Sequence, residues 1–283
     1  MSEALERTSP LKISPAKCER IGRMVPEETP IALVYDGVTH AVMLASPVDI
    51  EDFAIGFSFT EGKISNLDDV VEVDIVPREN GIEARIWLAP RAAVTNAKRR
   101  RALLGPTGCG LCGVESLEAA LPVIQQVESD LVLNVEDVLT AIESVMPAQV
   151  LNAQVKAMHA AGLWRKGEGL VALREDVGRH NALDKLTGAC VRNGIDASSG
   201  VIVLTSRVSV EMIQKAAKLG ASIVVAVSAP TALALRTADA AGITLIAIAR
   251  DDSFEVFTHR DRLRHGPGPE NSTLKENALH EAC

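Results

Sequence analysis

The chain has 283 residues, a net charge of −8 and a pI near 5.4, and this acidic balance argues against a general nucleic-acid binder, whose binding domain is usually basic. With 47% hydrophobic and 23% charged residues, it has the composition of a soluble globular protein with one large or two ordinary domains. It contains no apolar run of about 18 residues, the length that spans a bilayer, and its first ten residues carry charges where a signal peptide is apolar. We therefore expect a cytoplasmic protein with no membrane partner.

The N-terminal half is predicted to be a small α+β domain behind an irregular arm. Residues 1–24 include Pro10 and Pro15 and are predicted to form the arm. In residues 25–130, apolar runs flank Asp36-Gly37, a strong hairpin signal, and Asp49 is placed to cap a helix. The predicted strands are residues 31–35, 38–44, 70–76 and 82–88, the last two forming a second hairpin around Asn80-Gly81, and the predicted helix covers 49–57.

From about residue 130, β-branched runs alternate with helical patterns. This alternation is typical of a mostly parallel sheet with helices on both faces, so residues 131–264 are predicted to form an α/β domain. The predicted strands are residues 170–174, 201–205, 222–227 and 243–249, and the predicted helices are 181–192, 210–219 and 231–241. The polar residues 265–283 are expected to be a disordered tail.

Polar residues follow each of these predicted strands. They are Arg174-Glu175-Asp176, Ser206-Arg207, Ser228-Ala229-Pro230-Thr231 and Arg250-Asp251-Asp252. Ligands of α/β sheets usually bind at the carboxyl ends of the strands, which makes these segments candidates for a binding site. Some of the same residues could also cap the following helices.

Residues 105–113 contain a cysteine pair in a run of glycines, and this segment is the strongest candidate in the chain for a chemically reactive site. Glycine and proline in this density predict a turned segment that exposes Cys109 and Cys112. A helix-like stretch follows, so Cys112 is expected near a helix N-terminus, where partial positive charge favours the thiolate. The sequence thus predicts a reactive thiol loop.

Several kinds of site use a Cys-x-x-Cys. A disulfide oxidoreductase pair directly follows a strand, whereas the residues before this pair, 98–101, are a basic run. A zinc deaminase needs an upstream His-x-Glu, and His40-Ala41-Val42 has valine in place of the glutamate. Sulfur chemistry at one cysteine with the other as a helper, a structural zinc knuckle and an inert buried pair remain open. The five cysteines are dispersed, which fits a reducing compartment.

The cysteine loop and residues 174–185, 206–212 and 228–231 together resemble the FdhD/NarQ family of formate dehydrogenase accessory proteins, over roughly residues 25–262. The resemblance implies a homodimeric sulfur carrier. Its fold class would be α/β, with a C-terminal three-layer α/β domain similar to the cytidine deaminase fold and a smaller N-terminal α+β domain.

The resemblance also implies the partners. Sulfur from a cysteine desulfurase would be held as a persulfide on Cys109 and passed to the molybdenum (or tungsten) bis(molybdopterin guanine dinucleotide) cofactor for formate dehydrogenase. Cys112 could resolve the persulfide, tune the reactivity of Cys109 or only shape the loop. A cofactor-binding chaperone whose cysteines only shape a loop is the alternative function. No structural metal is expected.

The cofactor-binding segment of the family corresponds to Ile248, Ala249, Arg250, Asp251, Asp252 and Ser253. Arg179, Arg207 and Arg250 suit a pyrophosphate, because a guanidinium fork matches phosphate oxygens. Asp251 or Asp252 could accept hydrogen bonds from N1 and N2 of guanine. His180 is a candidate for proton transfer or phosphate contact, with Asp176 near enough in sequence to orient it.

Overall fold

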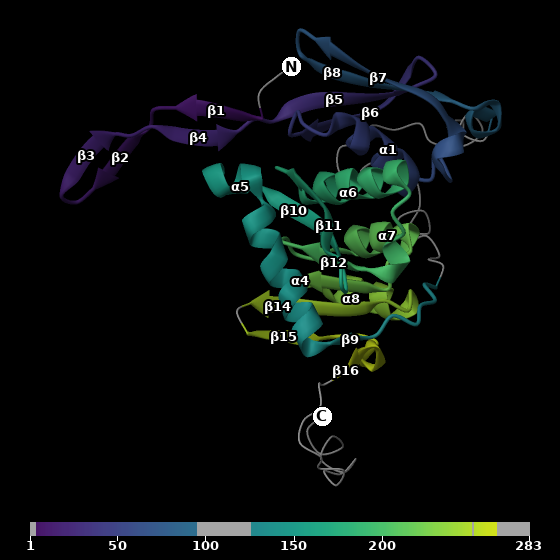
Figure 1. The fold of residues 1–283 in the computed structure, drawn as a ribbon. Coiled ribbons are helices and arrows are strands. Elements are labelled where there is room, and N and C mark those ends of the chain that lie inside the picture. The colour runs from purple at the N-terminus through teal and green to yellow at the C-terminus, as the bar shows by residue number, and fades with distance from the viewer. Residues whose placement is uncertain (1–3, 95–125, 251, 265–283) are drawn as a thin grey trace.

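The computed structural model describes residues 4–94, 126–250 and 252–264. It contains a long two-stranded arm, a small α+β unit and a larger α/β unit (Figure 1). Cys109 and Cys112, Asp251 and the predicted tail 265–283 lie outside the described residues. None of the helices within the described ranges has the length and apolar character needed to cross a bilayer.

The arm is an ordered β-ribbon, which corrects the prediction that residues 1–24 are irregular. Strand β1 (Leu5–Thr8) pairs antiparallel with β4 (Arg23–Pro26), and β2 (Leu11–Ser14) pairs antiparallel with β3 (Lys17–Arg20). Between the two pairs, the Ile21 amide donates to the Pro10 carbonyl at 3.0 Å. Pro10 therefore interrupts the strand without ending the hairpin, and Pro15 lies in the turn of the hairpin. The two prolines led to the prediction of an irregular segment, although the strands on either side of them are paired.

The α+β unit is a four-stranded sheet in the order β6-β5-β8-β7 with one helix beside it. Its elements are β5 (Thr29–Tyr35), β6 (Val38–Ala45), α1 (Ile50–Thr60), η1 (Leu67–Asp69), β7 (Val70–Arg78) and β8 (Gly81–Leu88). Both predicted hairpins are present, and Asp36 and Gly37 take φ values of 49° and 79°, as their tight turn requires.

Asp49 was expected to cap α1 with its side chain, and this expectation is wrong. Asp49 does occupy the position before α1, but it has a φ of 52° and its side chain makes no capping hydrogen bond. The carboxylate lies instead 3.7 Å from the Arg174 guanidinium. The Asp49 carboxylate thus interacts with a residue distant in sequence and not with the backbone amides of the first turn of α1.

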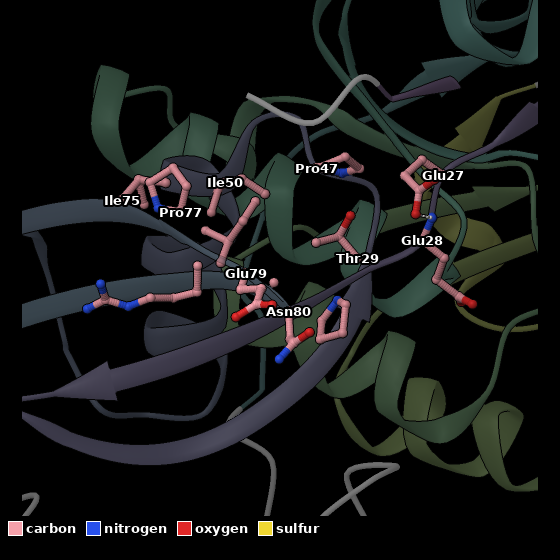
Figure 2. Close-up of a pocket in the computed structure, with 13 residues that line it drawn as sticks. Glu27, Glu28, Thr29, Pro47, Ile50, Ile75, Pro77, Glu79 and Asn80 are labelled. Atoms are coloured by element: carbon pink, nitrogen blue, oxygen red, sulfur yellow. Dashed lines mark hydrogen bonds between the residues drawn. The ribbon is translucent and has the colours of Figure 1, made fainter. Parts of the chain in front are cut away.

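A pocket of about 460 Å³ opens where the arm joins the α+β unit (Figure 2). It lies between the β4–β5 junction, the β7–β8 turn and the start of α1. Its apolar wall includes Ile75, Pro77 and Ile82, and the carboxylate residues at it are Glu27, Glu28 and Glu79.

The α/β unit is built on a six-stranded sheet in the order β11-β10-β12-β13-β14-β15. The strands are β10 (His159–Arg165), β11 (Gly169–Asp176), β12 (Val201–Leu204), β13 (Ile223–Ala226), β14 (Thr244–Arg250) and β15 (Ser253–Val256). The helices are α4 (Val135–Ala148), α5 (Val150–Val155), α6 (Arg179–Asn193), α7 (Val210–Leu219) and α8 (Ala232–Ala240), with short turns η2 (Ala197–Ser199) and η3 (Arg260–Arg262). A small parallel pair joins β9 (Leu133–Asn134) to β16 (Leu263–Arg264).

This sheet is mixed, which corrects the prediction of a mostly parallel one. Within the described part of this six-stranded sheet, only the β12–β13 and β13–β14 pairs are parallel, whereas β10 is antiparallel to both of its neighbours and β15 is antiparallel to β14. Strand β10 escaped prediction because its sequence, HAAGLWR, has no β-branched residue.

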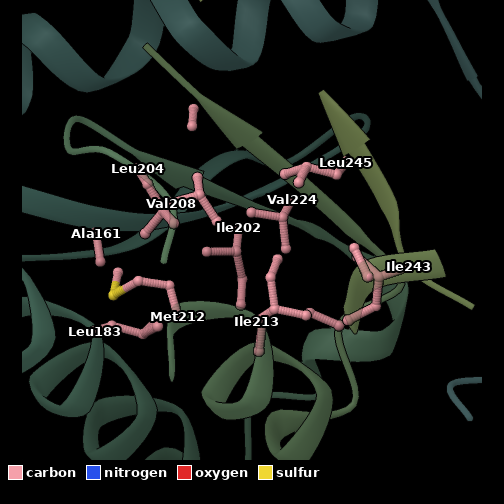
Figure 3. Close-up of a cluster of buried hydrophobic side chains, with 14 of the residues drawn as sticks. Ala161, Leu183, Ile202, Leu204, Val208, Met212, Ile213, Val224, Ile243 and Leu245 are labelled. Atoms are coloured by element: carbon pink, nitrogen blue, oxygen red, sulfur yellow. The ribbon is translucent and has the colours of Figure 1, made fainter. Parts of the chain in front are cut away.

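Helices cover both faces of the sheet, so the predicted three layers are present. On one face, α6, α7 and α8 pack on strand residues such as Ile202 and Val224, with Ile213 of α7 between them (Figure 3). On the other face, Val138 of α4 belongs to a second buried cluster with Val203. The alternation of neighbouring strand residues between these clusters follows from the two-residue period of a β-strand.

Helix α6 joins the two units, because α1 of the α+β unit packs against it at two glycines. A Cβ atom added to Gly56 would lie 1.7 Å from the Asp184 carbonyl oxygen, and one added to Gly188 would lie 1.8 Å from the Asp52 carbonyl oxygen. The two backbones can approach this closely only because neither position carries a side chain.

Buried ion pairs strengthen this junction. Lys185 is fully buried and lies 2.7 Å from the Asp176 carboxylate, which also accepts a 2.9 Å hydrogen bond from the Ser46 amide across the junction. Asp184 pairs with Lys215 at 2.8 Å and accepts a hydrogen bond from Thr60 at 2.7 Å. Asp176 and Asp184 therefore each bind a group of the α+β unit and hold the two units together.

Candidate functional site

The carboxyl ends of four strands lie along one edge of the sheet. Because β10 is antiparallel to both β11 and β12, β11 points the same way as β12, β13 and β14. The residues after these strands therefore share one edge, as the sequence predicted, even though the sheet is mixed. We call this edge the strand-end site.

Three of the predicted polar segments touch each other there. The Thr231 amide donates to the Val208 carbonyl at 2.9 Å, which brings the loop after β12 against the loop after β13. The Ile248 amide donates to the Ser228 carbonyl at 3.3 Å, and Arg250 Nε donates to the Val227 carbonyl at 3.3 Å. Arg207 and Arg250 are both exposed, so the site presents two guanidinium groups to solvent.

A bulge in β14 shapes the site. The pairing of β14 with β15 shifts register between Ala247 and Arg250, and Ile248 takes a φ of 53° with 37% of its surface exposed. The left-handed conformation costs a β-branched residue about 1 to 2 kcal/mol, and strain of this kind concentrates at functional sites. Ala249 is fully buried, while Asp252 and Ser253 are exposed.

His180 stands at the start of α6, beside the loop that precedes α7. Its Nε2 atom lies 3.4 Å from the Ser209 hydroxyl and 3.9 Å from a Glu211 carboxylate oxygen. Burial, helped by the charges of Arg179 and Lys215, lowers the pKa of His180 to about 4. The imidazole is therefore neutral at pH 7 and can accept or donate a hydrogen bond.

The expectation that Asp176 orients His180 is wrong. Besides Lys185 and Ser46, the Asp176 carboxylate accepts hydrogen bonds from the Gly178 amide at 2.7 Å and from Asn181 Nδ2 at 3.0 Å. Its lone pairs are used within the junction, and His180 is positioned by α7 instead.

Arg179 and His159 complete this part of the site. Arg179 Nε is buried without a hydrogen-bond partner among the described residues, so it has a donor to offer. His159 begins β10 at the same edge, opposite Asp176 in the β10–β11 register. Burial and the charge of Arg179 lower the pKa of His159.

The titration of His180 gives a first prediction. We expect its imidazole to stay neutral down to about pH 5, with a midpoint near 4. Because this pKa is below the unfolded value of about 6.5, the unfolded chain binds more protons between these values. The resulting stability is complete above about pH 6.5 and is lost as the pH falls toward 4. Imidazole C–H shifts measured by NMR would contradict this if the His180 midpoint lay near 6.5.

A model of the FdhD/NarQ family matches residues 26–264. The chain belongs to the FdhD/NarQ family. It is 48% identical over 258 residues to the sulfur carrier protein FdhD of Agrobacterium fabrum, covering 91% of this chain and 94% of the relative. It is 51% identical over 242 residues to the sulfur carrier protein FdhD of Brucella abortus, covering 85% of this chain and 90% of the relative.

The fold of this FdhD/NarQ chain is also found in a solved structure. A crystal structure described as a candidate formate dehydrogenase accessory protein from Desulfotalea psychrophila matches with a TM-score of 0.73 at 24% identity. The match covers 92% of this chain and all of that one. It supports the α/β architecture described above.

Sequence reasoning missed three residues of the FdhD/NarQ strand-end site. His159, Ser209 and Glu211 all lie near His180 or Arg179, yet they come from β10 and from the start of α7. Ser209 occupies the position before α7, and a serine there is expected as a helix cap. These residues lie beside His180 or Arg179 only because the chain folds, and no local sequence pattern predicts such contacts.

No metal ligand set appears in the part of the chain that the structure describes. There, no group of three or more His, Cys, Asp or Glu side chains could hold a metal ion. Cys109 and Cys112 are outside those ranges.

Proposed function

We propose that this FdhD/NarQ protein is a sulfur carrier that accepts sulfur on Cys109 and passes it to a guanine-dinucleotide cofactor for formate dehydrogenase. The observation that carries the proposal is the 48% identity, over nearly the whole length of both chains, with a curated sulfur carrier protein. The glycine-rich Cys-x-x-Cys supplies the chemistry, because a cysteine thiolate is a nucleophile that can attack a persulfide.

Loading requires a donor persulfide, which a cysteine desulfurase would present. The Cys109 thiolate attacks the outer sulfur, a new S–S bond forms on Cys109, and the donor S–S bond breaks. The electron pair of the broken bond leaves on the donor cysteine as a thiolate. The sulfur keeps its oxidation state, so loading needs no reductant.

Release as sulfide requires two electrons, and Cys112 can supply them together with Cys109. Attack by the Cys112 thiolate on the inner sulfur of the persulfide expels hydrosulfide and leaves a Cys109–Cys112 disulfide. A dithiol reductant then restores both thiols. The alternative is direct transfer of the neutral sulfur to the metal of the cofactor, which is oxidised by two electrons as the sulfur becomes sulfide.

The strand-end site suits the nucleotide part of the cofactor, which is the client of the carrier. Arg207 and Arg250 are exposed at adjoining loops, and the unpartnered Nε of Arg179 offers a further donor to a phosphate. Asp252 or Asp251 would face the guanine base. We also propose that the α/β unit is similar to the cytidine deaminase fold, whose helices likewise cover both sheet faces.

Sulfur loading is tested on the unmodified protein. After incubation with a cysteine desulfurase and cysteine, mass spectrometry is expected to find an adduct of about 32 Da on the peptide that contains Cys109. Treatment with a thiol reductant should remove the adduct. If the protein binds the cofactor but never acquires this mass, it is instead a cofactor-binding chaperone whose cysteines only shape a loop.

Nucleotide selectivity gives a second prediction. The isolated protein is expected to bind guanosine diphosphate about 5- to 150-fold more tightly than adenosine diphosphate. Guanine offers two adjacent donors to a carboxylate, whereas adenine has an acceptor at N1, and this mismatch costs about 1 to 3 kcal/mol. Calorimetry measures both affinities, and equal binding would contradict the assignment.

Single substitutions locate the two recognition elements. Asp252→Asn or Asp251→Asn should erase the preference for guanine, and Arg250→Ala should weaken both nucleotides alike. Lys166→Ala is the control, because Lys166 lies in the β10–β11 turn at the opposite end of the sheet.

A further inference from the structure

The pocket where the arm joins the α+β unit has an apolar floor and a charged rim, and we call it the root pocket (Figure 2). Among the residues that line it, Pro47 and Ile50 are buried and form its floor, whereas Glu28, Glu79 and Asn80 are exposed and form its rim. Its volume of about 460 Å³ lies within the range of roughly 300 to 1,000 Å³ that specific ligand sites occupy.

A close backbone contact fixes the shape of the root pocket. Gly81 begins β8, and a Cβ atom added there would lie 2.3 Å from the Pro30 carbonyl oxygen in β5. The β7–β8 turn can rest against the start of β5 only because this position carries no side chain. The parallel register continues from there with Ile31 opposite Ile82. The sheet of the α+β unit therefore holds the walls of the pocket in place.

Three carboxylates at the root pocket have no cationic partner among the described residues. Glu27, Glu28 and Glu79 take part in none of the ion pairs found there. Arg78 also lines the pocket, but Glu83 pairs with it at 3.0 Å, so Arg78 does not neutralise them. The three carboxylates do not converge as metal ligands either, because no group of that kind occurs in the described ranges. The rim therefore carries negative charge that a cationic ligand would balance.

The combination of floor and rim selects the class of ligand. A bare metal ion would gain nothing from the apolar floor, and a neutral apolar chain would leave the carboxylates of the rim without a counter-charge. A peptide segment in which an aliphatic side chain stands next to Arg or Lys satisfies both parts, because a guanidinium or ammonium group forms charge-assisted hydrogen bonds with carboxylates. An apolar anchor in a pocket with a polar rim is also the usual arrangement at the centre of a protein interface.

The root pocket adjoins the strand-end site. Pro47 lines the pocket, and its neighbour Ser46 binds the segment at the end of β11. The Ser46 amide donates to the Asp176 carboxylate at 2.9 Å, and the Val177 amide donates to the Ser46 hydroxyl at 3.2 Å. Because β11 ends at the strand-end edge, a protein that takes the cofactor from this edge brings its own surface beside the root pocket.

We propose that the root pocket binds a basic and apolar peptide segment of the recipient enzyme, formate dehydrogenase, while that enzyme takes the cofactor from the strand-end site. An aliphatic side chain of the segment packs on Ile75 and Ile82, and an adjacent Arg or Lys pairs with the carboxylates of Glu28 and Glu79. This inference rests on the proposed function, because it requires formate dehydrogenase to be the recipient. It adds the surface by which the recipient is held during delivery.

Charge reversal at the rim measures the docking. Glu79→Lys should lower the association rate constant with purified formate dehydrogenase that lacks its matured cofactor by about tenfold in surface plasmon resonance, since rim charges act mainly on association. Glu72→Lys is the matched control, because Glu72 is exposed on β7 and does not line the pocket, and it should change the rate by less than about twofold. Equal effects of the two substitutions, or no binding by the unmodified protein, would overturn the proposal.

Sulfur loading separates a failure of this inference from a failure of the proposed function. Glu79→Lys protein should acquire the adduct of about 32 Da and bind guanosine diphosphate as the unmodified protein does, and lose only the activation of formate dehydrogenase. If the unmodified protein itself neither loads sulfur nor activates the enzyme, the proposed function fails. If it does both and Glu79→Lys activates as well as Glu72→Lys, only the docking inference fails.

Photocrosslinking identifies the occupant of the pocket. In full-length protein with p-benzoylphenylalanine in place of Asn80 at the rim, irradiation should form a bond to formate dehydrogenase at a segment where Arg or Lys stands next to an aliphatic residue. The same amino acid in place of Glu72 should form no bond to that segment. Crosslinks only to a second copy of this chain, only to the cysteine desulfurase, or to a segment without a basic residue would each overturn the proposal.

Discussion

Cys109→Ala protein is expected to acquire no sulfur from a cysteine desulfurase and to give no active formate dehydrogenase. The thiolate at this position is the proposed acceptor, and alanine offers no sulfur atom to attack the donor persulfide. The measurements are the 32 Da adduct of about one sulfur atom per chain and the activity of formate dehydrogenase made in cells that carry the variant.

Cys190→Ala and Cys18→Ala are the controls. Cys190 is buried, and burial raises the pKa of its thiol to about 11, so it stays a thiol at pH 7 and cannot compete as a nucleophile. Cys18 is exposed but lies on the arm. Both variants should load and deliver sulfur normally. Full activation of formate dehydrogenase by Cys109→Ala would end the carrier proposal, and Cys112→Ala should be intermediate, or as severe if resolution by Cys112 is obligatory.

Lys185→Met is expected to destabilise the protein by about 3 to 5 kcal/mol. Methionine fills a similar volume, but it leaves the fully buried Asp176 carboxylate without its cation, and removing one partner of a buried ion pair has a cost of this size. Urea unfolding followed by circular dichroism measures the change.

The same substitution at an exposed ion pair is the control. Lys166 lies 2.6 Å from the Asp137 carboxylate with 52% of its side chain exposed, so Lys166→Met should cost no more than about 1 kcal/mol. If the two variants lost equal stability, the junction between α1 and α6 would not depend on the buried charge of Lys185.

Local signals predicted much of this fold. Asp36-Gly37 gave a hairpin because both residues of this tight turn take positive φ, and Asn80-Gly81 marked a second hairpin in which Gly81 takes a φ of 147° as the first residue of β8. The helix predicted over 210–219 is α7, Val210–Leu219, whose apolar residues follow the helical period. The polar strand ends were also found from sequence, since each comes at the end of an apolar run that was predicted to be a strand.

Contacts between distant segments decided the rest. Asp176 and His180 are neighbours in sequence, yet the carboxylate turns inward to Lys185 and Ser46 while the imidazole faces Ser209. Strand β10 has no β-branched residue and takes its strand form from pairing with β11 and β12 on either side. A local sequence pattern predicts the backbone conformation of the residues that form it. The partner of a charge or the neighbour of a strand depends on which surfaces meet when the chain packs, and that packing involves residues more than a hundred positions apart in the case of Ser46 and Asp176.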